Sequence, residues 1–104
     1  MKRQRNEDLD FLFEAVLSLK SLDECYLFFD DICTIKELAS LAQRMQVARQ
    51  LYDNRNYNQV YADTGVSSAT ICRVNKCLQY GDGGYKLALD RLLKGNVVNY
   101  ESDS

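Results

Sequence analysis

The feature that most constrains this chain is the absence of proline from its 104 residues, which contain only five glycines. Proline breaks helices and glycine punctuates turns, so a chain with so few of either favours helices joined by short turns. No segment shows the alternation of apolar and polar residues that is typical of a strand. The sequence therefore predicts an all-α protein of about six helices in a single domain over residues 1–104.

Apolar spacing and capping residues place most of the helices. A first helix is expected from about Glu7 to Leu19. Ser21–Glu24 and Thr34–Glu37 are capping boxes, in which the hydroxyl accepts a backbone hydrogen bond and the glutamate reaches back. The first box opens a helix over Cys25–Cys33, and the second opens a helix with an apolar stripe of Ile35, Leu38, Leu41, Ala42, Met45, Ala48 and Leu51. A last helix is expected over Tyr85–Lys94, followed by a loose tail at about residues 96–104.

Between these helices lies a short helix, a break with a glycine, and another helix. Asn56 is placed to cap Tyr57–Asp63, and Gly65 suits a left-handed turn. Ser67 then caps a helix over Ser68–Gln79. This succession, over about residues 57–79, is typical of a helix-turn-helix motif. Four apolar residues are spaced to bury the crossing of its two helices: Val60, Val66, Ile71 and Val74.

The second helix of this motif begins with short polar side chains, Ser67, Ser68 and Thr70. In DNA-binding helix-turn-helix proteins, residues at this place meet base edges in the major groove. Arg73 and Lys76 lie one turn later, within reach of a phosphate or a guanine edge. The alternative interpretation is an ordinary helical hairpin, in which the serines are caps and the arginine is solvated.

The charges are unevenly distributed along the chain. The formal net charge is −2, but residues 43–80 hold five basic and two acidic residues, whereas residues 1–42 hold five basic and nine acidic ones. The basic excess therefore coincides with the helix-turn-helix segment, as a surface that faces DNA requires.

Several other classes of function find little support in the sequence. The chain has no histidine, no glycine-rich phosphate loop and no nucleophile elbow, so we do not expect an enzyme. Its four cysteines, Cys25, Cys33, Cys72 and Cys77, form no Cys-x-x-Cys pair, and we expect reduced thiols and no bound metal or other cofactor. A redox role for Cys72 is the alternative. Since there is neither a membrane-spanning apolar run nor a secretory signal, we expect a cytoplasmic protein.

Two stretches resemble the tryptophan-repressor family and look closest to its repressor-related YerC/YecD branch. They are ELASLAQRMQVARQLYDN, residues 37–54, and GVSSATICRVNKCLQYGDGGY, residues 65–85. The resemblance runs from about Leu22 to Leu93. It implies an intertwined all-helical homodimer, in which outer helices of two chains form a shared core. It also implies a transcriptional repressor that binds a near-palindromic operator on double-stranded DNA with the second motif helix.

The same resemblance assigns roles to individual residues. It implies base contacts by Ser67, Ser68, Ala69, Thr70 and Cys72, and phosphate contacts by Asn58 and Lys76. In members that bind tryptophan, two arginines sandwich the indole ring of the corepressor, and the matching residues are Arg44 and Arg73. Those members have a glycine where this chain has Val74, whose branched side chain is expected to fill the pocket. We therefore do not expect tryptophan as the ligand. Either a smaller corepressor, of unknown identity, binds there, or Val74 holds the reading helix without a ligand; Arg44 is equally interpretable as a surface arginine.

A second function remains open at this point. A helix-turn-helix dimer could bind another regulator or a polymerase rather than DNA, and the acidic first 42 residues favour such a protein-interaction module. Salt dependence discriminates the two functions, because DNA affinity falls steeply with salt as counterions are released.

Overall fold

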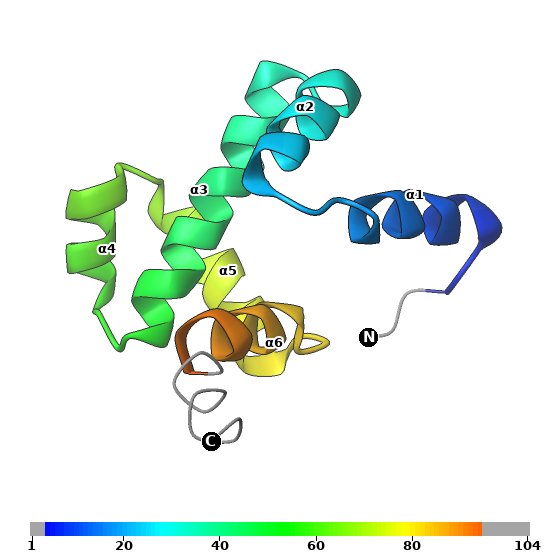
Figure 1. Cartoon of the computed structure of the whole chain (residues 1–104). Helices are drawn as coiled ribbons and strands as arrows, with labels where there is room; N and C mark the ends of the chain where they lie inside the picture. The colour runs from blue at the N-terminus through cyan, green and yellow to red at the C-terminus, as the bar shows by residue number, and fades with distance from the viewer. Residues whose placement is uncertain (1–3, 95–104) are drawn as a thin grey trace, which may run out of the picture. The chain divides into compact units, whose positions relative to one another are not determined.

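The structure, a computed structural model, describes residues 4–94 and is all helical in that range (Figure 1). Its helices are α1 (Glu7–Leu17), α2 (Leu22–Ile32), α3 (Ile35–Tyr52), α4 (Tyr57–Thr64), α5 (Ser68–Tyr80) and α6 (Gly84–Leu89), which continues into a π-helical turn, η1 (Asp90–Lys94). The predicted all-α class and helix order are confirmed, and no strand occurs among these residues. The predicted tail at residues 96–104 lies outside the described part of the chain.

Several helix bounds differ from the prediction, and the largest difference is at α2, which spans Leu22–Ile32 rather than Cys25–Cys33. The first helix ends at Leu17 rather than Leu19, because Ser18 caps it with its backbone N–H and also donates its hydroxyl to the Ala15 carbonyl at 2.6 Å. The last helix is not a single α-helix to Lys94, because its hydrogen bonding widens to the π pattern from Asp90 onward. The ends of α4 and α5 and the start of α6 each differ from the prediction by one residue.

The Thr34–Glu37 capping box forms as the sequence predicts, and the Ser21–Glu24 box forms only in part. Thr34 Oγ1 accepts the Glu37 N–H at 3.1 Å, and Glu37 Oε1 accepts the Thr34 N–H at 2.8 Å. At the start of α2, Ser21 Oγ accepts the Glu24 N–H at 3.1 Å, while Glu24 reaches one residue further and accepts the N–H of Lys20 at 2.8 Å. These bonds satisfy amides that a helix start otherwise leaves without partners.

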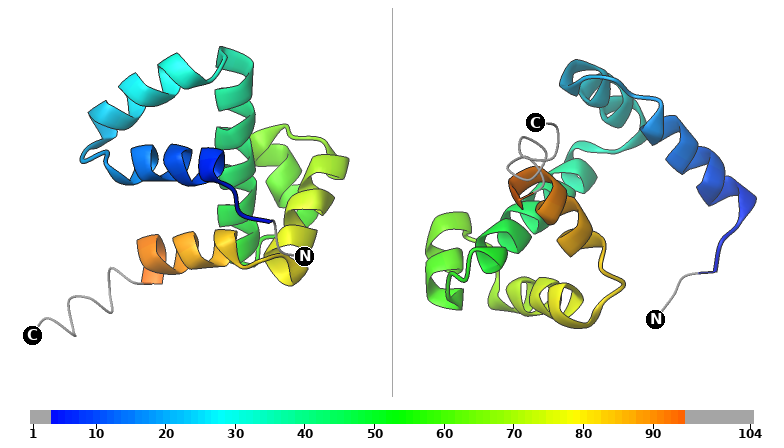
Figure 2. Two further views of the ribbon diagram at one scale, coloured as in Figure 1. Left: turned by 90° about the vertical axis from the view of Figure 1, so that its right-hand side faces the viewer. Right: turned by 60° about the horizontal axis from the view of Figure 1, so that its bottom comes forward.

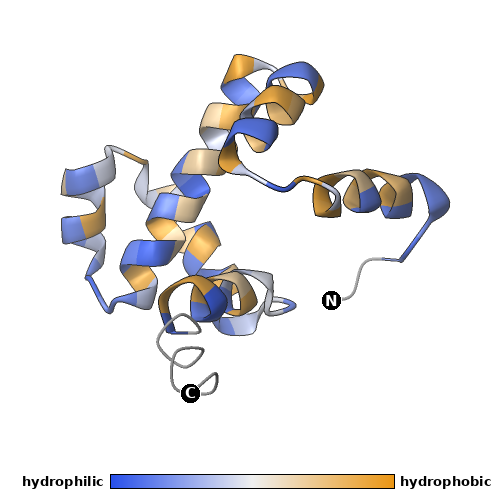
Figure 3. Cartoon of the chain, viewed as in Figure 1, coloured by the Kyte–Doolittle hydropathy of each residue, from blue (hydrophilic) through white to orange (hydrophobic). Residues whose placement is uncertain are grey.

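The chain divides into two compact units, which meet within α3: residues 1–41 and residues 42–104. In the first unit, neither α1 nor α2 contains a buried residue. Apolar residues nevertheless recur along both helices (Figure 3). Large apolar side chains that are exposed there include Phe11, Phe13, Leu17, Leu22, Tyr26, Leu27 and Ile32. The first unit thus has apolar surface but no closed core of its own.

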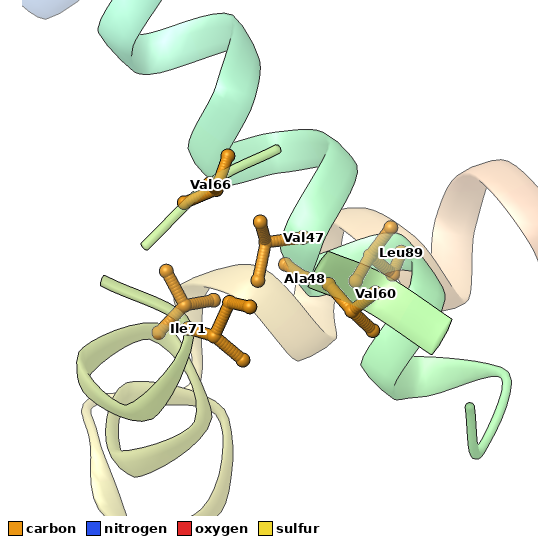
Figure 4. Packing of buried hydrophobic residues seen from close by; sticks show 7 residues of the cluster. Val47, Ala48, Val60, Val66, Ile71 and Leu89 are labelled. Atoms are coloured by element: carbon orange, nitrogen blue, oxygen red, sulfur yellow. The ribbon is translucent and has the colours of Figure 1, made fainter. Parts of the chain in front are cut away.

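The second unit contains the hydrophobic core (Figure 4), which consists of Val47, Ala48, Val60, Val66, Ile71, Val74 and Leu89. The four residues predicted to bury the crossing of the motif helices are all among them. Val47 lies beside the predicted α3 stripe and is fully buried, whereas Ile35 and Leu41 on that stripe are exposed. Since α5 also contacts both α4 and α6 (Figure 2), the core fixes α5 between its neighbours.

A cluster of polar side chains connects the end of α3 to the last helix through hydrogen bonds and charge interactions. The Tyr52 hydroxyl donates to Asp90 Oδ1, and Lys86 Nζ lies 3.3 Å from Asp90 Oδ2. Lys94 Nζ lies 5.4 Å from the centre of the Tyr52 ring. The bond to Asp90 raises the pKa of Tyr52 to about 12, and the same bond lowers the pKa of Asp90. No spacing or motif in the sequence predicted this cluster.

Candidate nucleic-acid interface

The turn between α4 and α5 is fixed by local hydrogen bonds. Asn56 and Gln59 form a reciprocal capping box, with both bonds at 2.9 Å. Gly65 has a φ of 69°, the left-handed conformation predicted for it, and its N–H donates to the Tyr61 carbonyl at 2.8 Å. The Thr64 hydroxyl donates to the Val60 carbonyl at 2.7 Å and accepts the Val66 N–H at 3.2 Å. The polypeptide therefore enters α5 along a defined path.

The start of α5 combines a serine cap with an apolar inner face. The Ser67 hydroxyl accepts the Thr70 N–H at 3.3 Å, as predicted, and donates to Thr70 Oγ1 at 3.1 Å. Thr70 is half-buried, whereas Ser67 and Ser68 are exposed. Part of the hydrogen-bonding capacity of Thr70 is thus already used within the first turn.

The other predicted DNA contacts lie on the outer face of the motif. Ala69, Cys72, Arg73 and Lys76 are exposed on α5, and Asn58 is exposed on α4. At about 100° per residue, Ala69, Arg73 and Lys76 point within roughly 40° of the direction opposite Ile71. Because Ile71 is fully buried, this outer stripe of α5 faces away from the core.

Charge distinguishes the two motif helices from the three helices that precede them. The first turns of α1, α2 and α3 each contain acidic residues, which complement the positive end of the helix dipole. The first turns of α4 and α5 contain none, and no acidic residue occurs anywhere in α5. The one acidic residue of α4, Asp63, pairs with Arg55 at 2.8 Å. The amides at the start of α5 therefore retain a positive potential that suits phosphate.

The residues that match a corepressor site are separated by the structure into different surroundings. Val74 is 2% exposed and packs in the core, so its side chain fills space between the helices. Arg73 and Arg44 are exposed, and within residues 4–94 neither side chain makes a hydrogen bond or ion pair. Burial raises the pKa of Tyr85, the Cys77 thiolate raises it further and Arg44 lowers it, so Arg44 lies within electrostatic reach of α6.

The cysteines and the hydropathy complete the description of the surface. Cys72 and Cys77 are exposed, Cys25 and Cys33 are half-buried, and none forms a disulfide. In the described range, no cluster of three or more cysteine, aspartate or glutamate side chains has the arrangement of a metal site. Among those residues, no helix has both the length and the apolar character needed to cross a membrane.

Known proteins are similar to this chain in sequence and in fold. The Trp repressor protein family matches residues 7–93. YerC of Bacillus subtilis (strain 168), an uncharacterised protein, is 54% identical over 88 residues, which are 85% of each chain. A candidate Trp repressor from Staphylococcus aureus has a crystal structure that superposes with a TM-score of 0.81 at 45% identity, covering 85% of this chain and 88% of that one. A TrpR-like protein from Eubacterium eligens ATCC 27750 gives a TM-score of 0.81 at 49% identity, covering 85% and 91%.

These similarities define a class, the small helix-turn-helix proteins that regulate transcription through DNA. The chain belongs to the Trp repressor family, as the sequence resemblance predicted.

Proposed function

We propose that the chain is a sequence-specific transcriptional repressor that binds a near-palindromic operator as a homodimer, with α5 in the major groove. The observation that carries the proposal is the outer stripe of α5, which has two cations and no acidic residue. The first turn of the helix therefore has no carboxylate to offset the positive end of its dipole. A polyanion is the ligand that such a surface fits.

Each motif residue has a role in this complex. Ser67, Ser68 and Ala69 approach the base edges, where the alanine methyl group suits a thymine methyl and the serines accept several bases. Arg73 and Lys76 contact phosphate or guanine further along the groove. Asn58 on α4 contacts the DNA backbone, which the first motif helix crosses.

The exposed apolar residues of α1 and α2 support the homodimer. Leu17, Leu22 and Leu27 are 83%, 79% and 70% exposed, respectively, and a second copy is the partner that would bury them. We treat residues 1–104 as one domain that completes its core across two chains. Two copies of α5 would then read half-sites about one helical turn, roughly 34 Å, apart.

The burial of Val74 supports a repressor that does not respond to tryptophan. Where the tryptophan-binding members have glycine, the valine side chain occupies volume that an indole ring would need. Titration calorimetry should show no heat with L-tryptophan and the wild-type protein. Heat from tryptophan at micromolar concentration would contradict this part of the proposal. A small-molecule corepressor of another kind remains a separate hypothesis, tested by adding metabolite extract to the DNA-binding assay.

The experiment that tests the function is selection of sheared genomic DNA from the source organism on the purified protein at two salt concentrations. Enrichment of a short inverted repeat that fades at high salt is the expected result. A double variant, Thr70→Ala with Arg73→Ala, should lose that binding and keep its helical circular-dichroism spectrum. If the double variant binds as well as the wild type, α5 is not the reading helix.

A protein-interaction module is the second candidate, favoured by the acidic starts of α1 and α2 beside their exposed apolar side chains. In that case the genomic selection should recover no repeat, even with cell metabolites present. Pull-down of RNA polymerase or another regulator, little affected by salt, would then support this candidate. Either function places the protein in the cytoplasm, where the chromosome and polymerase are.

A further inference from the structure

Tyr80, the last residue of α5, is more exposed than folding explains. Its side chain is 85% exposed, compared with 67% for Tyr26 and 57% for Tyr61. A phenol ring in water contributes nothing to a hydrophobic core, and its hydroxyl bonds no protein atom among residues 4–94. The residue therefore has a donor and an aromatic surface without a use in the chain that contains it.

Tyr80 continues the outer stripe of α5. It follows Ala69, Arg73 and Lys76 by eleven, seven and four residues, respectively. At about 100° per residue it lies roughly opposite the buried Ile71, on the same face as those three. The rise of about 1.5 Å per residue places it roughly 16 Å along the helix from Ala69.

The end of α5 keeps this position clear. The Gly81 N–H donates to the Cys77 carbonyl at 2.9 Å and closes the helix directly after Tyr80. A Cβ on Gly81 would lie 2.5 Å from that carbonyl oxygen, so only glycine allows this ending without a shift of the backbone. The chain leaves the helix here, and α6 starts at Gly84. Tyr80 is therefore the last residue of α5, and the backbone after it does not continue the helix.

The dimensions of the major groove suggest what Tyr80 meets. The groove is about 12 Å wide, so when α5 lies obliquely in it, an outer stripe of roughly 16 Å reaches from base edges at Ala69 to the sugar-phosphate backbone at the groove's edge. No acidic residue interrupts that stripe, and its two cations lie between the ends. The whole face is therefore compatible with a phosphate at the Tyr80 end.

Building on the proposed function, we propose that Tyr80 is a further DNA contact, whose phenol donates a hydrogen bond to a backbone phosphate at the edge of the groove. Such a contact holds α5 along the groove and sets the register of the first turn on the bases. It carries no base preference of its own. It also differs from the Lys76 contact, because a neutral donor displaces no counterion.

The test uses Tyr80→Phe, which removes the hydroxyl and keeps the ring. Fluorescence anisotropy with the selected operator should give affinity at least about 100-fold weaker than wild type, because each of the two copies loses a hydrogen bond to a charged group and each loss weakens binding roughly tenfold or more. The slope of log K against log salt should stay unchanged, whereas Lys76→Gln should reduce it by about 1.8, because the dimer loses one phosphate contact in each copy. The weakening should be equal on the operator and on operators with single base changes. Tyr61→Phe changes an exposed tyrosine on α4 to which no contact is assigned; it is the matched control and should bind like the wild type.

Each contrary result overturns a different statement. If wild-type protein binds the operator and Tyr80→Phe binds equally well, the Tyr80 contact is wrong and α5 enters the groove end-on. If Tyr80→Phe sediments with the mass of a monomer, Tyr80 lies between the two copies instead. A loss confined to one base pair would make Tyr80 a base reader and not a phosphate contact. Failure of the wild type to bind any DNA overturns the proposed function itself, and the Tyr80 contact with it.

Discussion

The two units of the molecule differ in how far a single copy completes them. Residues 42–94 enclose seven buried apolar side chains around the helix-turn-helix, whereas α1 and α2 bury none and expose large apolar residues. Hydrophobic burial is the main favourable term in folding, so the second unit has its own source of stability and the first requires a covering surface. Under the proposed function, the second unit would hold the DNA-binding surface in place and the first unit would form the dimer interface.

The same two regions differ in the charge at their helix starts. Acidic residues in the first turns of α1, α2 and α3 stabilise those helices through the dipole. The motif helices lack that stabilisation, although their N-caps, Asn56 and Ser67, are uncharged like Asn6 and Ser21 at the starts of α1 and α2. A helix start that must approach phosphate cannot have an acidic residue in the way, so the absence of acid follows from the proposed use.

The largest expected effect comes from opening the core of the second unit. Ile71→Ala removes a fully buried side chain between α5 and its neighbours and should cost about 2–5 kcal/mol of unfolding free energy. The melting temperature should fall by roughly 10 °C or more, measured by circular dichroism. A change of only a degree or two would mean that the second unit is held together by something other than this core.

The second prediction puts a charge on the apolar surface of the first unit. Leu27→Glu should weaken association, because each buried leucine contributes about 1.5–3 kcal/mol and each dimer contains two copies. Sedimentation at micromolar protein should show the monomer mass. Tyr61→Glu, at a comparably exposed position on α4, is the control and should remain dimeric. A dimeric Leu27→Glu would remove the argument that α2 forms the interface.

The third prediction exchanges the charge pattern between the regions. Ser68→Glu gives α5 the acidic first turn that α1, α2 and α3 have, so the stability should be unchanged or rise by about 0.3–1 kcal/mol. DNA affinity should nevertheless fall by about 1–3 kcal/mol or more, since a carboxylate then faces phosphate. Ser68→Gln is the uncharged control for thermal melts and anisotropy. Equal DNA affinity of both variants would show that the start of α5 does not face the DNA.

The sequence predicted the local features better than the distant ones. Helix order, capping residues, the left-handed Gly65 and the buried crossing of the motif all depend on residues close together in the chain, and they were predicted. The burial of Val47 was missed, because the spacing along α3 alone does not say which side other helices will cover. The Tyr52–Asp90 bond spans 38 residues, a separation at which sequence spacing carries no information about contact.

For the candidate site, motif positions predicted which residues contact DNA; those on α5 are exposed except Thr70, which is half-buried, and the contacts themselves stay a prediction. Tyr80 was not among the predicted contacts, which ended at Lys76, one turn earlier on the same helix. The lone feature that could have revealed it was its phase with Ala69, Arg73 and Lys76, a regularity that many solvated helices also have. Only the exposure in the folded chain separates a solvent-facing tyrosine from one that packs.

The smallest expected effect concerns the polar cluster in the second unit, and it depends on pH. The pKa of Tyr52 is raised to about 12, so the stability that this phenol contributes is complete below pH 10, its unfolded value, and is lost as the pH rises through 12. The pKa of Asp90 is lowered from 3.8, so its contribution is complete above that value and is lost as the pH falls through the folded pKa. The melting temperature of Tyr52→Phe should therefore lie slightly below that of the wild type between about pH 4 and 10. The two should converge above about pH 12 and below the folded pKa of Asp90.

Tyr85→Phe separates this cluster from a general effect of tyrosine in the second unit. Burial raises the pKa of Tyr85, and no carboxylate shares its proton, so this variant should differ from the wild type in pH dependence only on the alkaline side. Convergence of Tyr52→Phe with the wild type at acid pH, absent from Tyr85→Phe, would assign the acid limb to Asp90. If the two variants show the same acid limb, the Tyr52–Asp90 bond adds no stability and the core alone holds the last helix, which would make the second unit still less dependent on polar contacts than its structure suggests.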